Sequence, residues 1–147
     1  MLKKLIGLYY HKYTPRFLYK KCDGGKESGV TGYFLIEWKM VCSIGILHFK
    51  EGSREAYHNH AFNAVTWWLM GDVVEEHHPS GDHKYFKQSF IPKITNRNCF
   101  HKVIARKESY ALTFRGPWLD TWLEYRPSLN KEVMLTHGRK LVETRSV

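Results

Sequence analysis

The sequence predicts one all-β domain, a sandwich or barrel of short strands. Three observations support this fold class. The length of 147 residues fits a single compact domain. Hydrophobic residues make up 43% of the chain and aromatic residues 15%, enough to fill a core. From residue 30 onward, short runs rich in β-branched and aromatic residues alternate with Gly, Pro, Asn and Ser at intervals of about ten residues, as in sandwiches and barrels.

The strands follow one another without an intervening helical pattern. The runs that we expect to form them are residues 32–38, 41–49, 64–75, 84–90, 102–105, 110–115 and 121–125. Residues 79–82, with the sequence Pro-Ser-Gly-Asp, predict a hairpin turn. Residues 131–144 fit either a terminal strand through 133–135 and 140–142, turning at His137 and Gly138, or a frayed segment.

The chain divides into three parts. Residues 1–29 form a basic and aromatic N-terminal segment, 30–127 the barrel, and 128–147 a C-terminal strand or tail. Residues 1–18 fit an amphipathic helix stopped by Pro15, which would either pack on the barrel or lie on a membrane surface. Residues 22–29 are rich in Gly, Asp and Ser and predict a turn.

Charge and cysteine content limit the partners and the compartment. The 23 Lys and Arg against 14 Asp and Glu give a net charge of +9, which favours anionic partners. The basic residues are spread along the chain, so nucleic acid is not the expected partner. Cys22, Cys42 and Cys99 form no CxxC pair, which argues against a disulfide framework. No apolar run is long enough for a signal peptide or a membrane span, and a cytoplasmic location is expected.

Three histidines form the candidate metal site. His58 and His60 are two positions apart on an extended segment, so their side chains face the same way. His101 follows a hairpin and begins another strand. Three neutral imidazoles leave open positions for water or substrate, as a catalytic divalent metal requires. The ion could be Fe, Mn, Ni or Zn, which sequence does not distinguish.

This pattern resembles the cupin superfamily. In cupins an HxH motif is followed by a glutamate and a glycine, and a second motif leads from proline and glycine to one histidine. Gly71 has the motif's spacing from His60, and Pro92 precedes His101. The resemblance implies a double-stranded β-helix, a jelly-roll barrel, with an N-terminal helical or irregular segment.

The sequence departs from the cupin pattern in two places. Ala64 or Val65 stands where the pattern has glutamate, so the resemblance implies a metal site of three histidines. The second motif is longer than usual, with residues 96–98 in place of a tight glycine turn. The position of His101 relative to the other two histidines therefore stays open at this point.

Over residues 33–125 the chain looks most like small phage and bacterial cupin-like proteins of unassigned function. Ala61 and Phe62 follow the HxH, and a later strand leads into Gly116, Pro117 and Trp118, as in those proteins. If the chain is phage-encoded, the resemblance implies the host cytoplasm as its location.

Other residues near these motifs are candidates for binding a small anionic molecule. Tyr57 and Arg115 are the candidate catalytic residues, which would position the substrate. The candidate ligand-binding residues are Asn63, Arg97, Lys102 and Trp118. Glu37, Asp72 and Glu124 are candidates for proton transfer. His77, His78 and His83 flank the hairpin turn, where we expect them to be exposed rather than metal-binding.

Three functions remain open from the sequence. The first is a metal-dependent enzyme, an oxygenase, isomerase or hydrolase, that acts on a small anionic molecule. The second is a non-catalytic protein that sequesters such a molecule, for example a signalling nucleotide. The third is an interaction domain that presents Trp67 or Trp68 to a partner. Because these two residues are adjacent on one strand, one faces inward and the other outward, and the outward one would suit a homodimer interface.

Overall fold

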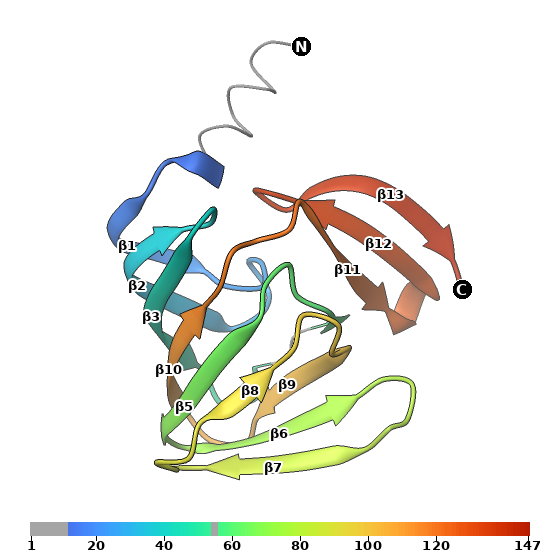
Figure 1. Ribbon diagram of the computed structural model, residues 1–147. Coiled ribbons are helices and arrows are strands. Elements are labelled where there is room, and N and C mark those ends of the chain that lie inside the picture. Colours follow the sequence, from blue (N-terminus) through green and yellow to red (C-terminus); the bar gives the residue numbers. More distant parts are fainter. Residues whose placement is uncertain (1–11, 54–55) are drawn as a thin grey trace.

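The computed structural model describes residues 12–53 and 56–147, which form two antiparallel sheets (Figure 1). The first sheet has the order β1 (Arg16–Cys22), β2 (Val30–Trp38), β3 (Cys42–Phe49), β10 (Ser109–Arg115), β5 (Ala64–Met70) and β8 (Lys93–Thr95). The second has the order β13 (Lys140–Ser146), β12 (Lys131–Thr136), β11 (Thr121–Arg126), β4 (Tyr57–His58), β9 (His101–Ala105), β6 (Asp72–His77) and β7 (His83–Lys87). One 3-10 turn, η1 (Pro127–Leu129), joins β11 to β12.

An apolar core fills one part of the space between the sheets. Its buried members come from both sheets, because successive side chains of a strand point to opposite faces. They are Val30, Phe34, Leu47, Phe49, Trp68, Val73, Val103, Ala105 and Ala111. A smaller cluster of Ala61, Phe62 and Ala64, with Trp118 and Trp122 packed against it, lies beside the candidate site. The predicted all-β barrel is confirmed.

The run predicted as one strand over residues 64–75 is two strands in different sheets. Gly71 separates β5 from β6 with a φ of +110°, a conformation that side chains rarely adopt. A Cβ at this position would also meet the Ser109 side chain at 2.0 Å. The chain turns sharply here, and the inward and outward alternation starts again in β6. The single-strand prediction was wrong because the apolar run continues across the break.

The two ends of the described chain add strands to the sheets. Residues 16–22 form β1, which pairs with β2, although the predicted helix extended to residue 18. Most of that predicted helix, residues 1–11, lies outside the described residues. At the other end, β12 and β13 pair as a hairpin that turns at His137 and Gly138, so the strand interpretation was right and the frayed one wrong. No helix within 12–53 and 56–147 is long and apolar enough to span a membrane.

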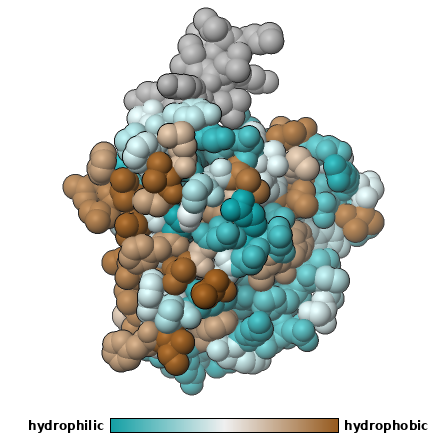
Figure 2. Space-filling view, in the orientation of Figure 1, coloured by the Kyte–Doolittle hydropathy of each residue, from teal (hydrophilic) through white to brown (hydrophobic). Residues whose placement is uncertain are grey.

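The adjacent tryptophans face opposite ways, as predicted. Trp68 is buried in the core, where its ring packs against Phe49 and Phe86. Trp67 is half-buried on the outer face of the six-stranded sheet and contacts Phe114. Figure 2 shows hydrophobic residues gathered along the side of the molecule where this sheet lies in Figure 1.

Candidate metal and anion site

The three motif histidines meet between the sheets. His58 on β4 pairs directly with His101 on β9, and His60 follows β4. The ring centroids are 4.6 Å apart for His58 and His60, 5.2 Å for His58 and His101, and 5.0 Å for His60 and His101. One potential ligand atom from each lies within 4.8 Å of the other two. The convergence predicted from the HxH spacing and His101 is therefore confirmed as geometry.

Backbone hydrogen bonds hold His60 in place beyond the end of β4. The Asn59 N–H donates to Leu123 O at 3.1 Å, and the Asn59 side chain accepts from the Leu123 N–H at 2.7 Å. The His60 N–H donates to Arg97 O at 3.1 Å. The extended path thus continues through His60, which keeps the two imidazoles on one side of the segment.

Glu75 lies behind His101 and orients its ring. This carboxylate is only 1% exposed, and its Oε1 is 3.0 Å from His101 Nδ1, while Lys93 contacts its other oxygen. Burial alone would raise the pKa of Glu75, but the contacts with His101 and Lys93 outweigh it and lower the pKa to about 2. Because Nδ1 faces Glu75, the Nε2 atom of His101 faces the other histidines, 2.8 Å from His60 Nε2. A carboxylate behind a histidine is the usual support of a metal-binding imidazole.

Burial keeps His60 and His101 in the neutral form that a metal ion needs. Burial lowers the pKa of His101 to about 4, against the opposing effect of Glu75. Burial and the neighbouring His58 and His101 lower the pKa of His60 well below its usual value. Neutral imidazoles are the form that coordinates a cation. Three nitrogen donors, a carboxylate behind one of them and an open side therefore fit a divalent metal ion.

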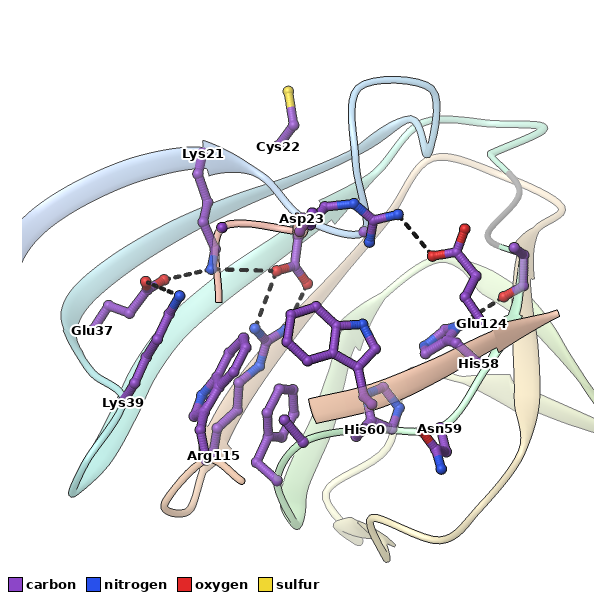
Figure 3. Close-up of a pocket in the computed structure, with 18 of the residues that line it drawn as sticks. Lys21, Cys22, Asp23, Glu37, Lys39, His58, Asn59, His60, Arg115 and Glu124 are labelled. Atoms are coloured by element: carbon purple, nitrogen blue, oxygen red, sulfur yellow. Dashed lines mark hydrogen bonds and ion pairs between the residues drawn. The ribbon is translucent and has the colours of Figure 1, made fainter. Parts of the chain in front are cut away.

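A cavity of about 290 Å³ opens beside His58 and His60 (Figure 3). Five basic residues line it, namely Arg16, Lys21, Lys39, Arg115 and Arg139. Three acidic residues also line it, namely Asp23, Glu37 and Glu124. The cavity therefore has an excess of two positive charges, which suits an anionic ligand.

Ion pairs fix most of these charges. Arg115, on β10, donates from both terminal nitrogens to Asp23, at 3.1 and 2.6 Å. Although burial opposes it, this pairing lowers the pKa of Asp23 far below its usual value. Lys21 Nζ is 2.6 Å from Glu37 Oε2. Figure 3 shows the Asp23–Arg115 pair between Lys39 and Glu37 on one side and the histidines on the other. Arg115 is thus at the cavity, as predicted, and is held there by Asp23.

Aromatic rings form another wall of the cavity. Trp118 packs against Phe62 and Trp122, with ring centroids 4.9 and 5.6 Å apart. The ammonium of Lys39 lies 4.6 Å from the Trp118 ring centroid, and that of Lys21 lies 5.4 Å from it. Trp118, a predicted ligand-binding residue, therefore lines the cavity, and its ring faces the cations that border it.

Tyr57 and Lys102 do not reach the cavity. Tyr57 precedes His58 on β4, so its side chain points to the opposite face, where its hydroxyl contacts Glu76. Lys102 is 3.3 Å from Glu76, and its ammonium lies 4.4 Å from the Tyr57 ring centroid. The prediction that Tyr57 and Lys102 contact a ligand in this cavity therefore fails on strand geometry.

Asn63 and Arg97 also lie outside the cavity lining. Asn63 is exposed, and its side-chain oxygen accepts the Arg97 N–H at 2.8 Å. Arg97 accepts a hydrogen bond from His60 through its backbone carbonyl. The geometry gives both residues a part in holding the loops around the histidines and does not support the predicted ligand contacts.

The other titratable candidates divide between the cavity and elsewhere. Glu37 and Glu124 are buried and line the cavity. Asp72 is buried away from it and pairs with Arg106 at 3.0 Å. His83 is exposed, as predicted, but His77 is not, because its Nε2 lies 2.9 Å from Glu75 Oε1.

Sequence reasoning missed Glu75, Lys39 and Asp23. Glu75 could have been found from the glycine break, since alternation restarted at Asp72 places Val73 and Glu75 on one face. Lys39 follows β2 directly, and Asp23 lies in the predicted turn at residues 22–29. Nothing local in the sequence distinguishes these two from surface charges, because the cavity that they line is built from distant segments.

Comparisons with known proteins show what the fold is. No family model matches the sequence, and no curated protein does. A sugar phosphate isomerase of the cupin superfamily from Silicibacter pomeroyi is similar with a TM-score of 0.57 at 10% identity, over 89% of this chain and 88% of that one. An RmlC-like cupin from Shewanella frigidimarina has a TM-score of 0.53 at 14% identity, over 65% and 81%. A salicylate 1,2-dioxygenase from Pseudoaminobacter salicylatoxidans has a TM-score of 0.51 at 10% identity, over 60% and 25%.

Two of these similar structures are described as cupins, as the histidine motif led us to expect. At these identities the likeness shows the fold alone. The chain therefore has the double-stranded β-helix fold of the cupin superfamily.

Proposed function

We propose that this chain is a metal-dependent enzyme that acts on a small anionic molecule, with His58, His60 and His101 as the metal ligands. The observation that carries the proposal is the convergence of three imidazoles, within 4.8 Å, beside a cavity with an excess of positive charge. A bound divalent cation would polarise a carbonyl or hydroxyl oxygen of the substrate.

Isomerisation by proton transfer is the reaction that the cavity supports best. Glu124 lies directly opposite His58 in the pairing of β11 with β4, which puts the two side chains on the same face. Its carboxylate accepts from Arg139 at 2.7 Å and from Arg126 at 3.4 Å. A carboxylate beside the ligands can take a proton from one carbon and return it to another. The similar structure from Silicibacter pomeroyi, a sugar phosphate isomerase, makes a phosphorylated sugar a reasonable substrate class to test.

The metal site is tested by elemental analysis of protein purified without chelators. We expect about one divalent ion per chain, and its loss in His58→Ala and in His101→Ala. His83→Ala is the matched control, because this histidine is exposed and lies on β7, away from the cavity, and it should keep the metal. Protein without metal, or metal that persists in both histidine variants, would refute the proposed ligands.

Turnover is tested by NMR in D₂O with a panel of sugar phosphates. An isomerase that works by proton transfer exchanges a carbon-bound substrate proton for deuterium, even where product does not accumulate. We expect exchange that requires the metal and falls at least about 100-fold in Glu124→Gln, which keeps the metal. Oxygen consumption by the metal-loaded protein without such exchange would favour an oxygenase. Tight retention of a nucleotide or organic acid by metal-free protein would instead favour the non-catalytic alternative.

A further inference from the structure

Among the described residues, Lys39 has an ion pair with Glu37 but no carboxylate within hydrogen-bond distance of its ammonium, unlike Lys21, Arg115 and Arg139. It lies just after β2, is 5% exposed, and lines the cavity. Within residues 12–53 and 56–147, its nearest carboxylate oxygen is Glu37 Oε1 at 4.0 Å, beyond hydrogen-bond distance. A buried ammonium has three donors, and leaving them unsatisfied costs free energy. An acceptor supplied by a ligand would remove that cost.

Three of the neighbouring cations are already engaged with carboxylates. Both terminal nitrogens of Arg115 donate to Asp23. Lys21 is 2.6 Å from Glu37, and Arg139 donates to Glu124 at 2.7 Å. An anion that bound to any of these would compete with a carboxylate for the same donors. Lys39 can accept an anion without breaking a hydrogen bond.

Lys39 and the histidines lie on different sides of the cavity. Figure 3 shows Lys39 beside Glu37 and Lys21, with His58 and His60 on the other side of the Asp23–Arg115 pair. They also come from different sheets, since Lys39 follows β2 of the six-stranded sheet and His58 is on β4 of the seven-stranded sheet. A molecule that fills the cavity can therefore contact the histidine site with one end and Lys39 with the other.

We propose that Lys39 is a binding residue for an oxyanion, a phosphate or carboxylate group at the end of the substrate away from the histidines. This inference deepens the proposed function. It rests on that function for the contact between the histidine site and the opposite end of the substrate. It narrows the substrate class to molecules with two separated polar ends, one that chelates and one that is anionic. The Trp118 ring, 4.6 Å from the ammonium, limits the space beside the anion.

The charges around Lys39 make its anion binding depend on pH. Burial and the cations Lys21 and Arg16 lower its pKa to about 8, while Glu37 and Asp23 oppose them. His137, from the β12–β13 turn, is the other titratable group near it, and burial lowers the pKa of His137 to about 4, so it stays neutral above pH 7. The protonated amine binds an anion and the neutral amine does not. Affinity should therefore fall as pH rises through about 8.

Sulfate is a suitable probe, because its charge does not change between pH 7 and 9.5. By calorimetry in the presence of a chelator, we expect sulfate affinity to fall roughly 10- to 30-fold over that range. Lys39→Met should weaken binding at pH 7 by about tenfold or more and remove the pH dependence. Lys20→Met is the matched control, because Lys20 is exposed on β1 and lies over the Tyr33 ring, and it should behave as the unaltered protein. Glycerol 3-phosphate and malonate, titrated in the same way, distinguish a phosphate from a carboxylate preference.

A second measurement needs no substitution and so does not depend on the folding of a variant. Sulfate should protect Lys39, but not Lys20, from acetylation when the modified lysines are read by mass spectrometry. Sulfate binding that is equal in Lys39→Met, or acetylation of Lys39 that sulfate leaves unchanged, overturns the proposal. These measurements are made without metal, so their outcome is independent of the metal test. Sulfate binding at Lys39 can be absent while the histidines bind metal, and it can be present in a protein whose histidines bind none.

Discussion

Where the six-stranded sheet borders the cavity, its two faces are reversed relative to an ordinary sheet, because the inner face is polar and the outer face is apolar. On β10, Thr113 and Arg115 point inward and are buried, while Leu112 and Phe114 point outward. The outward residues of neighbouring strands continue this pattern in two apolar rows. Across β2, β3, β10 and β5, one row is Tyr33, Ile46, Leu112 and Trp67. Across β3, β10, β5 and β8, the other is Ile44, Phe114, Val65 and Ile94.

The reversal separates two kinds of function. Polar groups inside a barrel cost free energy unless they are paired, so a buried cation such as Lys39 needs a reason to be there. A large apolar outer face also costs free energy unless something covers it. The interior therefore indicates a small polar ligand, and the exterior indicates a macromolecular surface.

The adjacent tryptophans give the largest test of this comparison. Trp68→Ala opens a cavity in the apolar core and should lower the free energy of unfolding by about 3–5 kcal/mol. Trp67→Ala, at the next residue but on the outer face, should cost about 1 kcal/mol or less in the monomer. Urea denaturation at low protein concentration measures both. Equal losses would mean that the outer face is as tightly packed as the core.

The interior should also make the protein acid-sensitive through His137, whose ring is 2% exposed and packs on Trp118. Burial lowers its folded pKa from 6.5 to about 4, so between these values the unfolded chain binds more protons than the folded one. This contribution to stability is complete above pH 6.5 and lost as pH falls to about 4, roughly 2–3 kcal/mol in all. The free energy of unfolding, measured by denaturation of the metal-free protein, should depend less on pH in His137→Gln by this amount. The same slope in both proteins would contradict a neutral, buried His137.

Strand positions were predictable because the alternation that defines a strand is local. The expected strand over residues 121–125, for instance, is β11. The break at Gly71 is hidden from this pattern, since Val73 and Val74 continue the apolar run beyond it, and the strand β1 alternates too weakly to stand out from its basic neighbours. The alternation within one segment does not show which other strand that segment pairs with.

The residues of the site divide in the same way, into those that the local pattern predicts and those that depend on strand pairing. The HxH spacing brought His58 and His60 together, and the cupin resemblance supplied His101. Alternation alone, applied one residue further, would also have turned Tyr57 away from the cavity. Glu75 could have been found from alternation restarted after Gly71, whereas Lys39 required knowledge of which strands face each other across the barrel, and that is set by long-range pairing.

The outer face leads to the last prediction, that two copies of this chain pack through it. Five strands at about 4.8 Å spacing and about seven residues at about 3.4 Å give a face of roughly 24 by 24 Å, on the order of 600 Å² in projection. A rough surface of that extent approaches the ~800 Å² per partner of a standard interface. The two rows contain no charged residue, so they can meet their own copy across a twofold axis without burying charge, and the His48–Glu108 pair of the neighbouring row would lie at the edge of the contact.

Sedimentation of the purified protein tests this pairing. We expect a dimer at micromolar concentration that Phe114→Glu converts to monomer, because the substitution buries two unpaired carboxylates at the interface. Tyr85→Glu is the control, since Tyr85 is also an exposed aromatic residue but lies on β7 of the other sheet. Each copy has a net charge of +9, so added salt should strengthen the dimer by screening the repulsion between copies. A monomer at every concentration, or a dimer that Phe114→Glu leaves intact, would mean that a different partner covers this face.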